Sequence, residues 1–213
     1  MSAATEPLAR RRPGRPRGGQ LLADRDELLA AAIRAIGEHG PDVTMEDIAA
    51  EATVSKPILY RTIGDRSALV VALSEWMIDQ ITTEITTALE ITTALEGYTE
   101  PGTQFEAAVR GYLAAVDTNR ALFLFVNAGG QPTDQLRRLV ERSAQLTIAL
   151  FAASAGRAPG GVASRTWAYS ILGAFQMVTV MWLDDDYCEL DTLAADLTRL
   201  LWPGIERLGK SPD

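Results

Sequence analysis

The sequence predicts an all-α protein. Apolar residues recur at steps of three and four along most of the 213-residue chain, as they do on one face of a helix. Val, Ile and Thr do not alternate with polar residues over any long segment, so strands are not expected. Hydrophobic residues make up 47% of the chain, which is enough for packed cores between such helices.

The distribution of charge sets the first twenty residues apart. Residues 1–20 contain five Arg and one Glu, a net charge of +4, whereas the whole chain carries −8. Any contact with a polyanion such as DNA must therefore be local and oriented. The sequence contains no long apolar run and no secretory signal, and Cys188 has no partner for an intrachain disulfide. We therefore expect a cytoplasmic protein without a membrane span.

Residues 1–20 are predicted to form a flexible basic arm. They are rich in Arg, Pro and Gly and show no hydrophobic period. Residues 13–17 resemble an AT-hook, in which Arg15 and Arg17 would enter a narrow A·T minor groove. The alternative is a solvated basic tail that raises only non-specific affinity for DNA.

Three short helices are predicted after the arm. The first begins at Asp24, which has the spacing of a capping box with Glu27, and it ends at Gly40. The second helix follows Thr44 and the third follows Ser55, and both of these residues are good N-caps.

The rest of the chain is predicted to be a helical bundle. A long helix should run from about Ser67 to Leu95 and stop at Gly97. Further helices are expected at residues 103–118, 119–127, 133–155, 161–183 and 191–207. The sequence ITTALE is duplicated in tandem at residues 85–96, and we attach no function to it. The predicted domains are an arm (1–20), a three-helix domain (21–66) and a bundle (67–213).

The second and third short helices have the spacing of a helix-turn-helix. Only residues 52–54 join them, too few for anything but a tight turn between steeply crossed helices. If Leu59 packs inward, the third helix presents a Lys, a Pro, a Tyr and an Arg to solvent. Lys and Arg can donate to guanine or phosphate, and Tyr can donate to phosphate. The alternative, on spacing alone, is a helical hairpin with solvated charges.

Residues 24–70 carry a dense pattern of motifs. It consists of the amphipathic first helix, MEDIAAEA at residues 45–52, VSKPILYR at residues 54–61, and Gly64-Asp65-Arg66 before Leu69. This stretch, about a fifth of the chain, resembles the N-terminal domain of the TetR family of transcriptional regulators. The resemblance implies a helix-turn-helix domain followed by a bundle for effector binding and dimerisation. It also implies a sequence-specific repressor without enzymatic activity, bound to a palindromic double-stranded DNA operator.

The resemblance further implies which residues contact DNA. Phosphate-contacting positions of the family are matched by Thr44, Tyr60 and Arg66, the last where a Lys is more usual. The recognition-helix positions are matched by Ser55, Lys56, Pro57, Ile58 and Arg61. Glu46 falls on a position that reads a base in some members and could accept from cytosine N4.

Two positions depart from the family pattern. The usual glycine of the turn is Thr53, so the turn must form without a positive φ or with some strain. The usual His-Phe after the recognition helix is Thr62-Ile63, which removes one possible phosphate donor.

The last two predicted helices are expected to pair with those of a second copy. The resemblance to the TetR family implies that these helices form the four-helix interface of a homodimer. The candidate interface residues recur at helical steps and are Trp167, Ile171, Phe175, Trp182, Leu197 and Leu201.

A pocket for a small effector is expected at the centre of the bundle. Its candidate lining residues are Trp76, Phe105, Tyr112, Phe123, Asn127, Tyr169 and Gln176. Few charges fall among these positions, so an apolar or weakly polar effector is favoured over a charged one. The alternative for each aromatic residue is an ordinary place in the core.

The sequence shows no arrangement typical of catalysis or metal binding. His39 is the only histidine and lies far from Cys188 in the sequence. Residues 184–186 with Glu189 could hold a hard cation, but they are interpreted as a solvated acidic turn. We expect no cofactor and no metal. The remaining alternative is an architectural DNA-binding protein that uses the basic arm without ligand control.

Overall fold

A computed structural model of the chain describes residues 24–97, 100–128, 138, 140–145 and 161–210. All regular structure in these residues is helical, which confirms the predicted all-α class. Three short helices come first: α1 (Arg25–His39), α2 (Met45–Glu51) and α3 (Lys56–Thr62). They are followed by the long α4 (Arg66–Glu96), α5 (Pro101–Thr118), α6 (Arg120–Asn127), α8 (Gly161–Asp185) and α9 (Leu190–Lys210).

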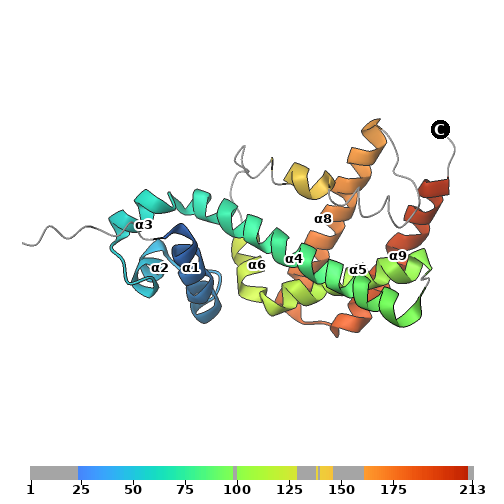
Figure 1. Cartoon of the computed structure of the whole chain (residues 1–213), viewed down its shortest axis with the longest axis horizontal. Helices are drawn as coiled ribbons and strands as arrows, with labels where there is room; N and C mark the ends of the chain where they lie inside the picture. Colours follow the sequence, from blue (N-terminus) through green and yellow to red (C-terminus); the bar gives the residue numbers. More distant parts are fainter. Residues whose placement is uncertain (1–23, 98–99, 129–137, 139, 146–160, 211–213) are drawn as a thin grey trace, which may run out of the picture.

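The three short helices lie at one end of the molecule, and α4 leads away from them along the bundle (Figure 1). Helix α4 packs along α5, which also packs against α9, and α6 contacts α1, α4 and α8. Of the helix predicted at residues 133–155, Arg138 and residues 140–145 are helical, and the others lie outside the described residues. Helix α6 is thus placed between the short helices and the bundle.

The starts of α1 and α2 are fixed by side chains that accept backbone N–H groups. Asp24 accepts from the N–H of Asp26 at 3.1 Å. The predicted reciprocal pair with Glu27 is therefore wrong, because the short Asp24 side chain is satisfied one residue earlier. The full capping box lies instead at α2, where Thr44 and Asp47 each accept from the other's backbone.

The helix ends at Gly40 and Gly97 were predicted from the glycines and are confirmed. Their φ angles are +84° and +72°, in the region that only glycine adopts without strain. A third glycine, Gly111, lies where α5 crosses α4. A Cβ atom built there would lie 2.8 Å from the backbone oxygen of Glu84, so the two helices approach closely because this residue has no side chain.

Both parts of the chain have buried apolar side chains. Leu28, Ile36, Ile48 and Leu59 are at most 2% exposed and hold the three short helices together. The core continues through the first turns of α4 into the bundle. This packing determines which face of α3 is left for solvent.

Candidate DNA-binding surface and effector domain

The turn between α2 and α3 forms with strain at one residue. Thr53 has φ +54°, and its N–H donates to the oxygen of Ala50 at 3.0 Å. The N–H of Val54 donates to the oxygen of Ala49, also at 3.0 Å. A β-branched residue in the left-handed region costs on the order of 1–2 kcal/mol. Of the two outcomes that the sequence allowed for this turn, the structure adopts the strained one.

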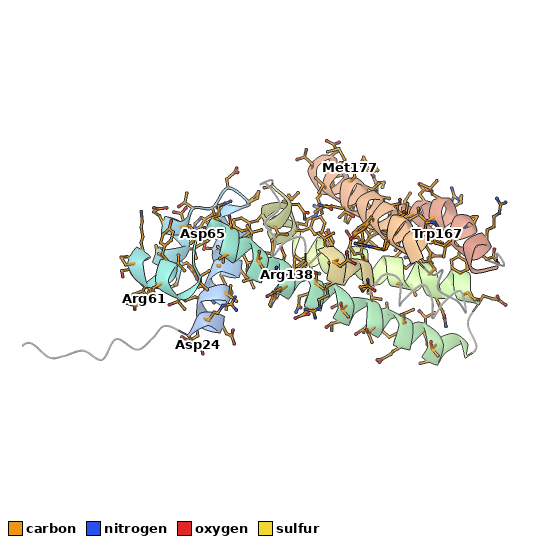
Figure 2. The ribbon with its side chains drawn as sticks, turned by 90° about the horizontal axis from the view of Figure 1, so that it is seen from above. Asp24, Arg61, Asp65, Arg138, Trp167 and Met177 are labelled. Carbon is orange, nitrogen blue, oxygen red and sulfur yellow. The ribbon has the colours of Figure 1, made fainter. Side chains whose placement is uncertain are left out.

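Helix α3 presents its polar side chains outward. Leu59 is fully buried, whereas Lys56, Pro57, Tyr60 and Arg61 are exposed, as the inward packing of Leu59 predicts. Figure 2 places Arg61 among the short helices, far from Trp167 in the bundle. Ile58, the other predicted base contact, is half-buried beside them. The result is an exposed helix face that carries hydrogen-bond donors.

Two predicted base-reading residues are paired with each other. The Lys56 ammonium donates to the Glu46 carboxylate, and both side chains are about half exposed. This hydrogen bond is the main reason that the pKa of Glu46 lies below its ordinary value. DNA that engages Lys56 must therefore replace or share the Glu46 contact.

Thr44 and Ser55 occupy the first positions before α2 and α3. The Thr44 hydroxyl donates to Asp47 at 2.6 Å and accepts from the Asp47 N–H at 3.2 Å. Ser55 is the N-cap residue of α3, as predicted, but its exposed side chain makes no cap hydrogen bond. Its hydroxyl is free to bond elsewhere, whereas that of Thr44 is already used within α2.

Arg66 does not lie on the outward face of α3. Its Nη1 donates to the backbone oxygen of Val43 at 2.8 Å, and its guanidinium lies 4.4 Å from the ring centre of Phe125. The structure therefore directs this predicted phosphate contact toward α6. The arm residues Arg15 and Arg17 lie outside the described residues.

Part of the predicted effector site is brought together between α5, α6 and α8. The buried Tyr112 hydroxyl donates to Thr179 at 3.2 Å, and burial raises the pKa of Tyr112 to about 12. Phe123 is 5% exposed. Gln176 donates to Asn127 at 2.6 Å, which links α8 to α6. These contacts are uncharged, as the sequence analysis expects of the site.

The structure also gives the positions of three other candidate lining residues. Phe105 packs against Trp202 of α9, with ring centres 5.7 Å apart. It lies about two helical turns before Tyr112 on α5. Tyr169 is exposed and donates to Glu141, a contact that lowers the pKa of Glu141. Trp76 is half-buried on α4. Phe105 and Tyr169 therefore have partners away from Tyr112 and Thr179, and their place at an effector site stays a prediction.

Comparison with known proteins shows which family the chain resembles. Residues 28–73, from α1 into α4, match the family described as bacterial regulatory proteins of the tetR family. An uncharacterized HTH-type transcriptional regulator from Mycobacterium tuberculosis strain H37Rv is 29% identical over 186 residues, 85% of this chain and 76% of that protein. The chain is thus similar to transcriptional regulators of the TetR family, and the family match itself covers residues 28–73.

Solved structures share the fold of this chain. A TetR-like transcriptional regulator from Rhodococcus sp. RHA1 has a TM-score of 0.58 at 22% identity, covering 86% of this chain and 96% of that one. The regulator FadR from Bacillus subtilis, in complex with stearoyl-CoA, has a TM-score of 0.62 at 14% identity, covering 84% and 97%. These likenesses confirm an N-terminal helix-turn-helix domain followed by a helical domain.

Several residues predicted for the dimer interface lie inside one protomer of the regulator. Trp182 is 3% exposed and donates through Nε1 to the oxygen of Cys188 at 2.7 Å. Leu197 is 4% exposed, and Phe175 packs edge-on against Tyr112. Trp182 and Leu197 are thus buried in the protomer's own core, whereas Phe175 is half-buried, and their place in a dimer interface stays a prediction. Of the others, Trp167, Ile171 and Leu201 are half-buried.

A different stripe of α8 is exposed in this chain. Tyr169, Gly173, Met177 and Met181 recur at steps of four residues, and all are exposed. Met177 is 65% exposed, and Figure 2 shows it on the outer side of α8. Sequence reasoning missed this stripe because the larger aromatic residues of α8 form a parallel apolar face. The four-residue step itself was the available signal.

A hollow on the regulator's long helix was also missed. It has a volume of about 410 Å³ and is lined by Thr86, Leu89, Glu90, Thr93 and Ala94 of the duplicated segment. The hydroxyls of Thr86 and Thr93 donate to carbonyls one turn earlier. The surface that they offer there is therefore mostly apolar. None of the predicted effector residues lines this hollow.

No group of metal-binding side chains is present in the part of the chain that the structure describes. Asp184, Asp185 and Asp186 are exposed, and Asp186 accepts from Arg120 at 3.0 Å. Among the described residues, no helix is long and apolar enough to cross a bilayer.

Proposed function

We propose that the protein is a cytoplasmic homodimeric repressor that binds a near-palindromic operator and is released from it by a small apolar effector. The observation that carries the DNA-binding part is the outward face of α3. Lys56, Tyr60 and Arg61 are exposed there, while Leu59 anchors the helix from its buried side. Such a helix can enter the major groove with its donors toward base edges and phosphates.

The proposed roles follow the chemistry of each side chain. Lys56 and Arg61 donate to guanine acceptors, while Pro57 and Ile58 touch thymine methyl groups. Tyr60 and Ser55 donate to phosphate, and Thr44 does so if its hydroxyl leaves Asp47. Glu46 accepts from cytosine N4 once Lys56 has turned to the DNA.

The exposed stripe of α8 supports the dimer. Gly173 allows a second helix to approach closely, and Met177 and Met181 supply unbranched side chains that fill irregular gaps. Trp167, Ile171 and Leu201 are half-buried and would be covered at its margins. A two-fold axis would then place two α3 helices in successive major grooves, roughly 34–36 Å apart.

The effector is proposed to bind between α5, α6 and α8. Tyr112 and Phe123 provide apolar walls, and the Asn127–Gln176 pair provides a neutral polar group at the edge. Trp76 of α4 would close the site from the side of the long helix. The structurally similar FadR is in complex with stearoyl-CoA, which makes long acyl chains the first class to test. A ligand here shifts the equilibrium only if it binds the non-DNA-binding state more tightly.

The basic arm is proposed to add minor-groove contacts through Arg15 and Arg17. Deleting residues 1–20 should then weaken binding more on A·T-flanked operators than on G·C-flanked ones. An equal loss on both would leave the arm as a non-specific basic tail.

The central test is selection of bound fragments from the organism's own genomic DNA. The expected product is a near-palindrome with half-sites one or more helical turns apart. Only asymmetric single sites would count against the dimer, and sequence-insensitive binding would favour the architectural alternative.

The effector is tested by adding stearoyl-CoA to the full chain, with and without operator. It should raise the thermal unfolding temperature and release the DNA. Phe123→Leu should abolish both responses, whereas the matched change Phe105→Leu, in a side chain that is buried against Trp202, should leave both in place. Stabilisation without release would contradict the proposed switch.

A further inference from the structure

One arginine at the start of α4 touches both parts of the chain. Arg66 is the first residue of α4. It donates to the oxygen of Val43, in the loop between α1 and α2, and its guanidinium lies over the Phe125 ring of α6. A single side chain thus joins the loop before α2, the start of α4 and the middle of α6.

Both partners of Arg66 are themselves fixed. Val43 and Phe125 are each 2% exposed. Val43 directly precedes Thr44, whose capping box with Asp47 begins α2, so a restraint on the Val43 carbonyl is also a restraint on the start of α2. On the other side, α6 is tied to α8 by the hydrogen bond from Gln176 to Asn127. Arg66 therefore stands between the DNA-binding helices and the bundle.

The geometry uses properties that a guanidinium has and an ammonium lacks. The central carbon of the Arg66 guanidinium lies over the Phe125 ring, while Nη1 of the same group donates to the oxygen of Val43. A lysine in its place would be a point charge without a flat face. The two contacts together therefore depend on arginine.

We propose that Arg66 is a positioning residue, not a phosphate contact: through Val43 and Phe125 it fixes α2, and with it α3, relative to α6. The inference rests on the proposed function, because the helices that it positions are the proposed DNA-binding surface. Movement of α6 would then reach α2 through this side chain without any contact between Arg66 and DNA.

The first test needs no DNA. Amide hydrogen exchange is measured in α2 of the full chain for Arg66→Lys, which keeps the charge, and for Phe125→Leu. Exchange should become about 5- to 30-fold faster in both, as expected from losing one or two modest contacts. The double variant should be no faster than the faster single variant, since both remove the same link.

A matched control comes from the other arginine that lies over an aromatic ring. Arg120 lies 5.3 Å from the ring centre of Trp182, in the bundle. Arg120→Lys should leave exchange in α2 unchanged. Exchange in α2 that is as slow in Arg66→Lys as in the unmodified chain would overturn the proposal.

The second test separates positioning from phosphate contact. Arg66→Gln should weaken operator binding about 5- to 30-fold at every salt concentration, with the salt dependence unchanged. A lost phosphate contact would instead lower the slope of log affinity against log salt by about 0.9 for each contact, and that result would overturn the proposal. If the unmodified chain binds no operator, the proposed function fails, while the exchange experiment still decides the role of Arg66.

Discussion

The polar contacts of the short helices and those of the bundle differ in how far they reach along the sequence. In the first region, Thr44 bonds to Asp47 three residues later, and Lys56 bonds to Glu46 ten residues earlier. In the bundle, the hydrogen bond from Tyr112 to Thr179 joins residues 67 apart, and the one from Arg110 to Asp191 joins residues 81 apart. The DNA-binding surface is therefore defined largely by local structure, whereas the effector and dimer surfaces depend on the assembled bundle.

The exposed faces of the two regions also differ in polarity. Helix α3 exposes Lys56 and Arg61, which suit a charged and hydrated partner. Helix α8 exposes Tyr169, Met177 and Met181, which suit a partner that excludes water. Substitutions in the two regions should therefore fail in different ways.

The largest effect is expected from Arg61→Ala. Each half-site should lose a base contact worth about 1–3 kcal/mol, and specificity should relax at one position of each half-site. The measurement is operator affinity against a set of single-base variants. Tyr60→Phe is the control and should weaken all sequences nearly equally. Unchanged specificity in Arg61→Ala would remove that residue from base recognition.

A smaller effect is expected from Met177→Glu on the α8 stripe. The two-fold axis brings two copies of the new carboxylate into the interface, so the dissociation constant of the dimer should rise about 10- to 100-fold, roughly 1.4–2.7 kcal/mol. Sedimentation measures this directly.

A matched control for Met177→Glu is offered by α4. Leu95 is 81% exposed and lies outside the α8 stripe. Leu95→Glu should leave the association unchanged. Equal dissociation in both variants would mean that the loss is a general effect of charge.

The next effect concerns the close crossing of α4 and α5. Gly111→Ala places a methyl group against the backbone of Glu84, so the helices must separate and stability should fall by about 1–2 kcal/mol. Denaturant unfolding measures the loss. Gly37→Ala in α1 meets no atom within 4 Å and should instead stabilise by about 0.5–1 kcal/mol. An unchanged stability of Gly111→Ala would show that α4 and α5 can move apart at this crossing without cost.

How much could be predicted from the sequence depends on how far apart in the sequence the contacting residues are. The end of α1 at Gly40 and the exposure of Lys56 and Arg61 were predictable, because each depends on residues within a few positions. Trp182 was assigned to the dimer because helical spacing marks an apolar face without saying what covers it. One of its partners, Arg120 at the start of α6, lies far away in the sequence and is set by tertiary packing.

Arg66 shows the same limit inside the better predicted region. Its position in the motif favoured a phosphate contact, but the side chain is long enough to turn back to Val43 and Phe125. Phe125 lies 59 positions later, so no local pattern could reveal the contact. The motif predicted the backbone correctly, while the direction of this side chain depends on the neighbouring domain.

The smallest effect is expected at the turn of the helix-turn-helix. Thr53 has φ +54°, which costs a β-branched residue on the order of 1–2 kcal/mol, while a glycine would give back about 0.5–1 kcal/mol through its greater freedom in the unfolded chain. Thr53→Gly should therefore stabilise the protein by about 0.5–1 kcal/mol without changing operator preference, because Thr53 lies before α3 and not on its outward face. Thermal unfolding and operator affinity are measured together. Thr62→Gly, at the last residue of α3, is the control and should instead destabilise the protein by roughly 0.2–0.4 kcal/mol. Loss of stability in Thr53→Gly would mean that the Thr53 side chain contributes more than its backbone strain costs, and the local account of this region would then be incomplete.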